Sequence, residues 1–206
     1  MDDESDQRAR QLKTCHLGSA ADVLDMLSWQ ISDLAATPPA SLRAIDYKSM
    51  LASVTAWQLS DWAFESLPPT LYRAWTLPSR KGDTALMCFQ NWVREACPAL
   101  KICREISNAF KHRTLRRDAQ PDITSDTMNR LGEDMQLSVR LIFTHEGFVR
   151  DPLDVLSEAH SFWAERLMEA GLHDRSAEAR RLLSLEHDPS GWGRPTDDRI
   201  ASKEGR

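Results

Sequence analysis

Two proline pairs, Pro38-Pro39 and Pro68-Pro69, are the feature that most constrains how this chain can fold. A residue that precedes proline is biased away from the helical conformation, so each pair marks the end of a helix. Before the first pair, apolar residues recur at helical spacing from a capping residue, Ser19, onward. Between the pairs, the same spacing runs from about Leu42 to Ser66. The pattern predicts two consecutive helices that meet at the first proline pair.

Two further helices are predicted in the middle of the chain. Residues 70–82 connect the second helix to the third, which either Asp83 or Thr84 can cap and which runs to Cys97. Pro98 then either breaks the chain or occupies the first turn of a fourth helix that extends to about residue 113. Because almost no loop separates these two helices, we expect a kink or a tight corner between them.

The C-terminal half predicts strands and one more long helix. Apolar and polar residues alternate from Leu137 to Thr144, which is the period of a strand. We expect a hairpin at about 136–150, a third strand near Ile123, and a helix at about 152–170 that starts at Asp151. The predicted fold class is therefore mainly α, a multi-helix bundle with a small antiparallel β-hairpin inserted before a long C-terminal helix.

Composition limits the domain organisation and the class of protein. We expect a flexible acidic arm at 1–15, a single helical-bundle domain at 16–186 and a disordered tail at 187–206. The sequence contains neither an apolar run long enough to span a membrane nor a secretory or transit signal, which favours a cytoplasmic protein. The net charge of −5 argues against nonspecific coating of nucleic acid but leaves a local site open.

Motifs for the common enzyme classes are missing from the sequence. There is no phosphate-binding glycine loop, no nucleophile elbow and no dinucleotide fingerprint, so we expect no cofactor. The four cysteines lack the spacing of a zinc site, which predicts reduced, mostly buried thiols and no metal. These are Cys15, Cys88, Cys97 and Cys103.

The fourth predicted helix combines a basic face with an apolar stripe. At helical spacing, the polar face gathers five functional side chains. They are Lys101, Arg104, Asn108, Lys111 and His112. Ile102, Ile106, Ala109 and Phe110 fall on the other side, which we expect to pack against the bundle. Residues 101–117 contain six basic residues and only one acidic residue, Glu105. This segment, which includes Arg113, Arg116 and Arg117, is called the basic island.

The segment Arg104-Glu-Ile-Ser-Asn-Ala-Phe-Lys-His112, set in a helical bundle of this size, resembles the HEPN superfamily. The resemblance covers about Leu42 to Arg117, with an Arg-to-His spacing slightly longer than the usual family motif. Many family members dimerise and are metal-independent ribonucleases of toxin and antiphage systems. The resemblance therefore implies a candidate ribonuclease, or an accessory subunit of such a system, with Arg104 and His112 as the catalytic pair.

This reading assigns roles to the basic island. His112 would transfer the proton of a ribose 2′-OH, and Arg104 would hold the phosphate. Asn108, Lys111 and Lys101, together with Arg113, Arg116 and Arg117, would bind RNA at the local basic patch. The alternative is a catalytically inert protein–protein interaction module built on the same bundle, as a homodimer or with a partner protein.

The seven tryptophans favour a core role over base stacking. Trp29, Trp57, Trp62, Trp92 and Trp163 lie within helical patterns beside apolar residues, so we expect them in the core. Trp192 lies between two glycines of the predicted tail, where it could anchor a protein partner.

Overall fold

The two proline pairs lie where the sequence predicts that helices end. The computed structural model describes residues 17–78, 81–111, 123–131 and 137–173. Helix α2 spans Ala20–Ala35 and α3 spans Leu42–Ser66, as predicted, and the short α4 spans Pro69–Ala74 within the expected connector. Ser19 caps α2, since its hydroxyl accepts a hydrogen bond of 3.2 Å from the backbone N–H of Asp22.

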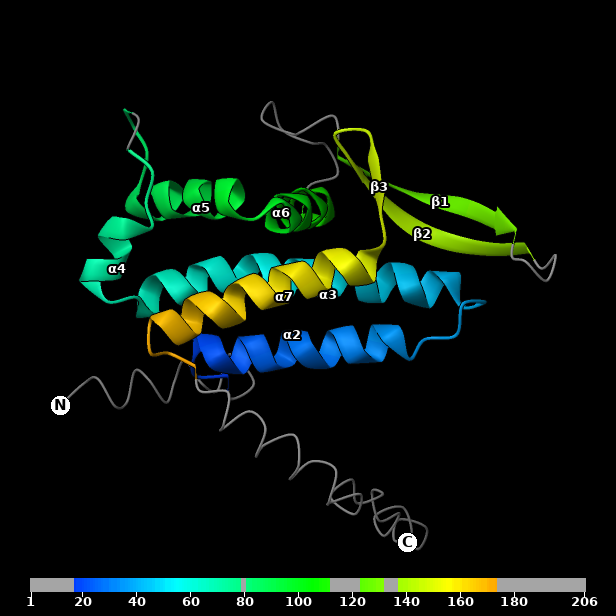
Figure 1. The fold of residues 1–206 in the computed structure, drawn as a ribbon, viewed down its shortest axis with the longest axis horizontal. Coiled ribbons are helices and arrows are strands. Elements are labelled where there is room, and N and C mark those ends of the chain that lie inside the picture. Colours follow the sequence, from blue (N-terminus) through cyan, green and yellow to red (C-terminus); the bar gives the residue numbers. More distant parts are fainter. Residues whose placement is uncertain (1–16, 79–80, 112–122, 132–136, 174–206) are drawn as a thin grey trace, which may run out of the picture. The chain divides into compact units, whose positions relative to one another are not determined.

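The next two helices meet at a corner, as predicted. Thr84 caps α5, which spans Ala85–Ala96, and its hydroxyl accepts a hydrogen bond of 3.2 Å from the backbone N–H of Met87. Helix α6 spans Pro98–Lys111, so proline occupies its first turn, where no backbone hydrogen bond is lost. In Figure 1, α6 is seen nearly end-on whereas α5 lies across the view, so the chain turns sharply between them.

A small antiparallel sheet precedes the last described helix. Strands β1 (Thr124–Leu131), β2 (Leu137–His145) and β3 (Phe148–Arg150) pair in the order β1-β2-β3. The register places Phe143 of β2 opposite Ser125 of β1 and Arg150 of β3. Glu146 and Gly147 form the two-residue turn between β2 and β3, and both have positive φ angles, 52° and 78°, as a tight hairpin requires. The predicted hairpin and third strand are confirmed.

Three long helices carry the core of the bundle. Helix α7 spans Pro152–Glu169 and begins at Asp151, whose carboxylate accepts a hydrogen bond of 2.8 Å from the N–H of Leu153. Helices α2, α3 and α7 contact one another, and α6 packs on α3 and α7 (Figure 1). Buried leucines such as Leu24, Leu59 and Leu167 fill the space between them. The fold is mainly α with a small antiparallel sheet before α7, as the sequence predicts.

Aromatic residues close one end of this core. The rings of Trp75 and Trp92 stack with their centroids 5.4 Å apart, and the Arg166 guanidinium lies 5.6 Å from the Trp75 ring centroid. Trp163 is buried and donates a hydrogen bond of 2.9 Å to the backbone oxygen of Ala56. Trp57 is also buried, and Trp62 and Trp92 are partly buried against the core. The prediction for Trp29 was wrong: its side chain is 67% exposed, because it lies on the side of α2 opposite Leu24 and Leu27.

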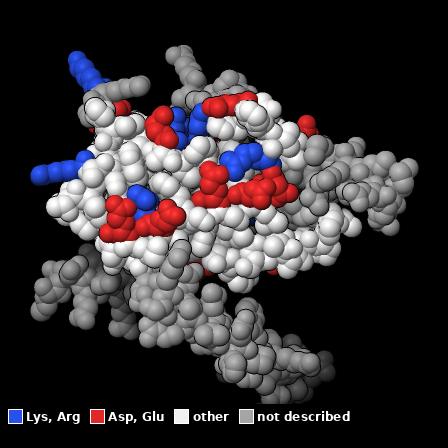
Figure 2. All heavy atoms as spheres, in the orientation of Figure 1, with Lys and Arg blue, Asp and Glu red and all other residues white. Residues whose placement is uncertain are grey.

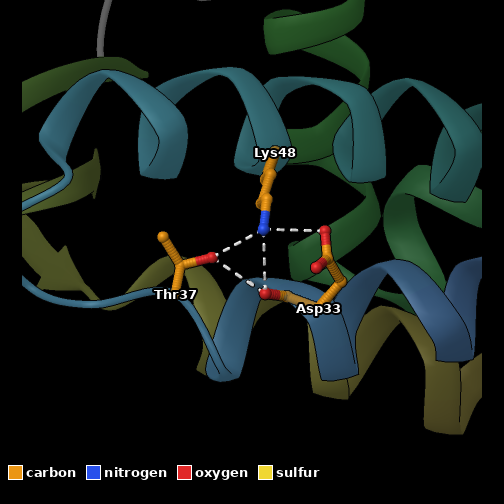
Figure 3. Close-up of polar contacts among 3 residues, drawn as sticks. All are labelled: Asp33, Thr37 and Lys48. Atoms are coloured by element: carbon orange, nitrogen blue, oxygen red, sulfur yellow. Dashed lines mark hydrogen bonds and ion pairs between the residues drawn. The ribbon is translucent and has the colours of Figure 1, made fainter.

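An ion pair joins α2 to α3 (Figure 3). The Lys48 ammonium lies 2.8 Å from a carboxylate oxygen of Asp33 and donates hydrogen bonds to the Thr37 hydroxyl and the Asp33 backbone oxygen. These acceptors lie in the last turn of α2 and just beyond it, where the helix dipole favours a positive charge. Lys48 therefore fixes the end of α2 against the first half of α3.

The described residues all belong to one compact unit of the chain. The predicted arm at 1–15, the final part of the predicted domain at 174–186 and the predicted tail at 187–206 lie outside the described residues and stay predictions. Among the helices that the structure describes, no stretch combines the length and the apolar character that a membrane crossing needs.

Candidate functional site

The first turn of helix α6 contacts a carboxylate of α7 that also binds the end of β3. Glu158 of α7 accepts a hydrogen bond of 3.3 Å from the backbone N–H of Ala99. Its second carboxylate oxygen lies 2.7 Å from a guanidinium nitrogen of Arg150, at the end of β3. A carboxylate at a helix N-terminus is favourable because the unpaired N–H groups there carry partial positive charge. Glu158 therefore links α6 and the end of β3 to α7.

The basic face of α6 is compensated by acidic side chains. Arg104 contacts the carboxylate of Glu105, and the two side chains are 16% and 6% exposed. The Lys101 ammonium lies 3.7 Å from a carboxylate oxygen of Glu146, in the hairpin turn, and His145 Nε2 lies 3.5 Å from the same oxygen. The two cations that the structure describes on this face therefore have carboxylates next to them.

The structure brings together only part of the predicted ribonuclease site. Lys101, Arg104 and the half-buried Asn108 lie on one side of α6, at the predicted spacing of about one turn. Lys111 is the last residue of the helix. His112, Arg113, Arg116 and Arg117 lie outside the described residues, so the geometry of the Arg104–His112 pair stays a prediction.

The predicted packing face of α6 was wrong in part. Ile102 is buried as expected, but Ile106 is only partly buried, Ala109 is exposed and Phe110 is 56% exposed. The other buried residues of the helix include Leu100, Cys103 and Ser107. At about 100° per residue, the centre of the buried face lies about 45° around the helix from the centre of the predicted stripe, in the direction of Cys103.

Small side chains explain this rotation. Ser49, Ala52 and Ser53 of α3 are fully buried, and the Cys103 thiol of α6 lies within hydrogen-bonding reach of the Ser53 hydroxyl. Small residues let two helix backbones approach closely, so the closest contact between helices need not carry the largest apolar side chains. The apolar residues at the C-terminal end of α6 are thereby left beside open space.

This open space is a groove between α3, α6 and the sheet, which we call the α3–α6 groove. Its volume is about 660 Å³, within the roughly 300–1,000 Å³ of typical ligand sites. Tyr47 and Phe110 are 57% and 56% exposed, whereas Phe143 of β2 is fully buried. The lining residues are Asp46, Tyr47, Ser49, Met50, Ile106, Ala109, Phe110, Ser125, Asp126 and Phe143.

Two polar atoms of the groove lack hydrogen-bond partners. The Oδ1 atom of Asp46 and the Oγ atom of Ser49 are both buried, and neither has a partner among the described residues. Buried polar atoms in proteins are nearly always hydrogen-bonded, because an unpaired one costs about 1–3 kcal/mol. The first turns of α3 therefore hold two buried oxygen atoms at the groove that a bound group can satisfy.

No protein-family model, curated protein or solved structure matches this chain. The comparisons thus leave the resemblance to the HEPN superfamily as a prediction.

The groove was not predicted from the sequence, although two of its lining residues could have indicated it. Tyr47 stands outside the apolar stripe of α3, and Phe110 stands at the end of α6 next to Lys111. At both positions a large aromatic side chain lies beside the predicted core and not within it.

The described cysteines do not supply a nucleophile. Cys88, Cys97 and Cys103 are buried free thiols, as the sequence predicts. Burial raises the pKa of Cys97 to about 11 and that of Cys103 to about 12, so both thiols are protonated at neutral pH. Within the described ranges, no cluster of three or more His, Cys, Asp or Glu side chains could hold a metal ion.

Proposed function

We propose that this chain is a binding module that receives a segment of another protein in the α3–α6 groove. The observation that carries the proposal is the exposure of Tyr47 and Phe110 on either side of a hollow whose buried wall includes Phe143. Aromatic side chains left in water around a concave surface are typical of protein-binding sites, where they supply most of the binding energy. This proposal corresponds to the interaction module that the sequence left open.

The framework around the groove supports a binding role. Lys48 fixes α3 to α2, and Glu158 fixes α6 to α7 and β3. A groove whose walls are held by such contacts loses little conformational entropy when a partner binds, and this favours affinity.

Peptide selection tests this function. Panning a random peptide library on the full chain should yield peptides whose binding is measured by fluorescence anisotropy. We expect Phe110→Ala to weaken binding by about tenfold or more, because the ring is a large part of the contact area. Phe148→Ala is the matched control, since Phe148 is 73% exposed and does not line the groove. Peptides that bind both variants equally, or no selected peptide at all, would contradict the proposal.

A metal-independent ribonuclease is the second proposal. It is supported by the row that Lys101, Arg104 and Asn108 form on one side of α6, immediately before His112. In this proposal Arg104 holds a phosphate and His112 transfers a proton, either in an active enzyme or in an accessory subunit of a toxin or antiphage system. The cytoplasm is the compartment that both proposals assume, and a homodimer is the assembly that the ribonuclease would use.

A further inference from the structure

We propose that the α3–α6 groove recognises a protein segment by a cationic side chain, lysine or arginine, that binds beside Asp46 and Ser49 between apolar neighbours. This inference rests on the proposed binding function and names the chemistry of the partner. It predicts that the flanking apolar side chains of the segment pack on Tyr47 and Phe110, which stand exposed at the groove.

The unpaired carboxylate oxygen of Asp46 is satisfied by a hydrogen-bond donor, and the Ser49 hydroxyl can accept from the same donor. Asp46 Oδ1 and Ser49 Oγ are buried at the groove without partners among the described residues. An ionised carboxylate only accepts hydrogen bonds, so the group that satisfies Asp46 has to donate. An ammonium or a guanidinium group donates and also brings the opposite charge, which makes the hydrogen bond about twice as strong as a neutral one.

The described lining of the groove does not provide this cation. Among the described residues that line the groove, none is Lys or Arg, and Asp126 of β1 adds a second carboxylate to the lining. The ammonium of Lys48, although adjacent to Ser49 in sequence, is engaged with Asp33 and Thr37 on α2 (Figure 3). Arg43, one turn before Asp46, makes no ion pair with it among the described contacts. The groove is therefore acidic as well as apolar.

The carboxylates of the described lining disfavour a phosphate backbone in the groove. A nucleic acid would bring negative charge next to Asp46 and Asp126, which is unfavourable at short range. A lysine or arginine instead buries its aliphatic stem against apolar surface such as Met50 and Ile106 while its charged end reaches the carboxylate. The rings of Tyr47 and Phe110 also attract a cation that lies over their faces.

The test combines a changed peptide with a changed protein. Peptides selected on the full chain are synthesised with the basic residue kept, replaced by norleucine or replaced by glutamate. Binding to the wild type, Asp46→Asn and Glu65→Gln is measured by fluorescence anisotropy. Glu65 is the control because it is an exposed carboxylate near the other end of α3. Thermal melts of each variant establish that it is folded.

We expect the norleucine peptide to bind the wild type about tenfold more weakly, the loss typical of one charge-assisted hydrogen bond. In Asp46→Asn, replacing the basic residue of the peptide by norleucine should change the affinity little, because the carboxylate that the basic residue contacts is already gone. Together the four affinities form a double-mutant cycle for this pair. In Glu65→Gln the tenfold loss should persist.

Each contrary outcome has a defined meaning. If Phe110→Ala abolishes binding but the norleucine exchange has the same effect in the wild type and Asp46→Asn, the cation inference fails and the binding function stands. If no peptide depends on Phe110, both fail. Displacement of the peptide by a labelled single-stranded RNA would overturn the cation inference. So would a dimer, measured by light scattering at micromolar concentration, that Phe110→Ala dissociates, because a second copy would then occupy the groove.

Discussion

The partner of Arg104 could not be predicted from its position in the sequence. Its place on α6 was predicted from helical spacing, but its contact with the buried Glu105 was not. Residues adjacent in a helix diverge by about 100° and do not normally face each other, so helical spacing does not predict that these two side chains pair. In the folded chain Glu105 is buried although it lies beside the polar face of α6, and its carboxylate contacts the Arg104 guanidinium.

This pairing changes the expected cost of removing Arg104. Arg104→Ala should lower the free energy of unfolding by about 1–3 kcal/mol, because the carboxylate of Glu105 would stay buried beside a lost cation. The double variant Arg104→Ala/Glu105→Gln should recover part of that loss. Urea unfolding measures both. An Arg104→Ala variant as stable as the wild type would show that the ion pair contributes nothing.

The buried thiols predict a loss of stability at alkaline pH. The folded pKa values of Cys97 and Cys103, about 11 and about 12, lie above the value of about 8.5 for an unfolded thiol. Their contribution is therefore complete below about pH 8.5 and is lost as the pH rises toward the folded values. At pH 9.5 the loss should be about 1 kcal/mol for each thiol relative to pH 7.5.

The comparison that isolates this effect uses the double variant Cys97→Ala/Cys103→Ala. Its free energy of unfolding should fall less between pH 7.5 and pH 9.5 than that of the wild type, since the other titrating groups are common to both. Equal slopes for the two proteins would contradict the assignment.

The ends of the helices could be predicted from the sequence, but the rotation of α6 about its own axis could not. The limits of α2, α3 and α7 depend on local signals, namely the caps Ser19 and Asp151 and the proline pairs, which the sequence displays directly. The rotation of α6 depends on its contact with small residues of α3, such as Ser49 and Ser53, which no apolar period reveals. The groove exists because of that rotation, so the sequence alone did not predict it.

Two truncations in α6 test the rotation. Leu100 is fully buried whereas Ile106 is only partly buried and lines the groove. Leu100→Ala should cost about 3 kcal/mol of stability, as fully buried truncations do, and Ile106→Ala about 1 kcal/mol. Chemical denaturation separates the two values. If Ile106→Ala proved the more destabilising, the apolar stripe predicted from the sequence would be the true packing face.

At the level of the molecule, the pairing of charges among the described residues bears on the choice between the two proposed functions. In the central part of the face drawn in Figure 2, blue basic atoms lie against red acidic ones. The structure contains ion pairs such as Arg150–Glu158 and Arg166–Glu169, at 2.7 Å and 2.8 Å. The net charge of −5 was available from the sequence, but the pairing of individual charges depended on tertiary structure. Within the described residues this pairing is unfavourable for an RNA surface, and Arg113, Arg116 and Arg117 of the basic island lie outside them.

The ribonuclease proposal makes a separate prediction. If the basic island is a ribonuclease site, the purified protein should cleave RNA in EDTA and spare DNA, because its mechanism uses the ribose 2′-OH and no metal. The products should end in a 2′,3′-cyclic phosphate, and His112→Ala should abolish cleavage without lowering the melting temperature. Intact RNA across pH 5 to 8, or full activity in His112→Ala, would leave the binding module as the only proposal.

Nuclear magnetic resonance can establish whether a peptide binds in the α3–α6 groove. A selected peptide is titrated into the ¹⁵N-labelled full chain, and the amide shifts are mapped on the structure. If the peptide binds in the groove, the largest changes should cluster at lining residues, including Tyr47, Phe110 and Ser125, and Phe110→Ala should remove them. Changes centred instead on α2 around Trp29, with the groove amides unmoved, would contradict it.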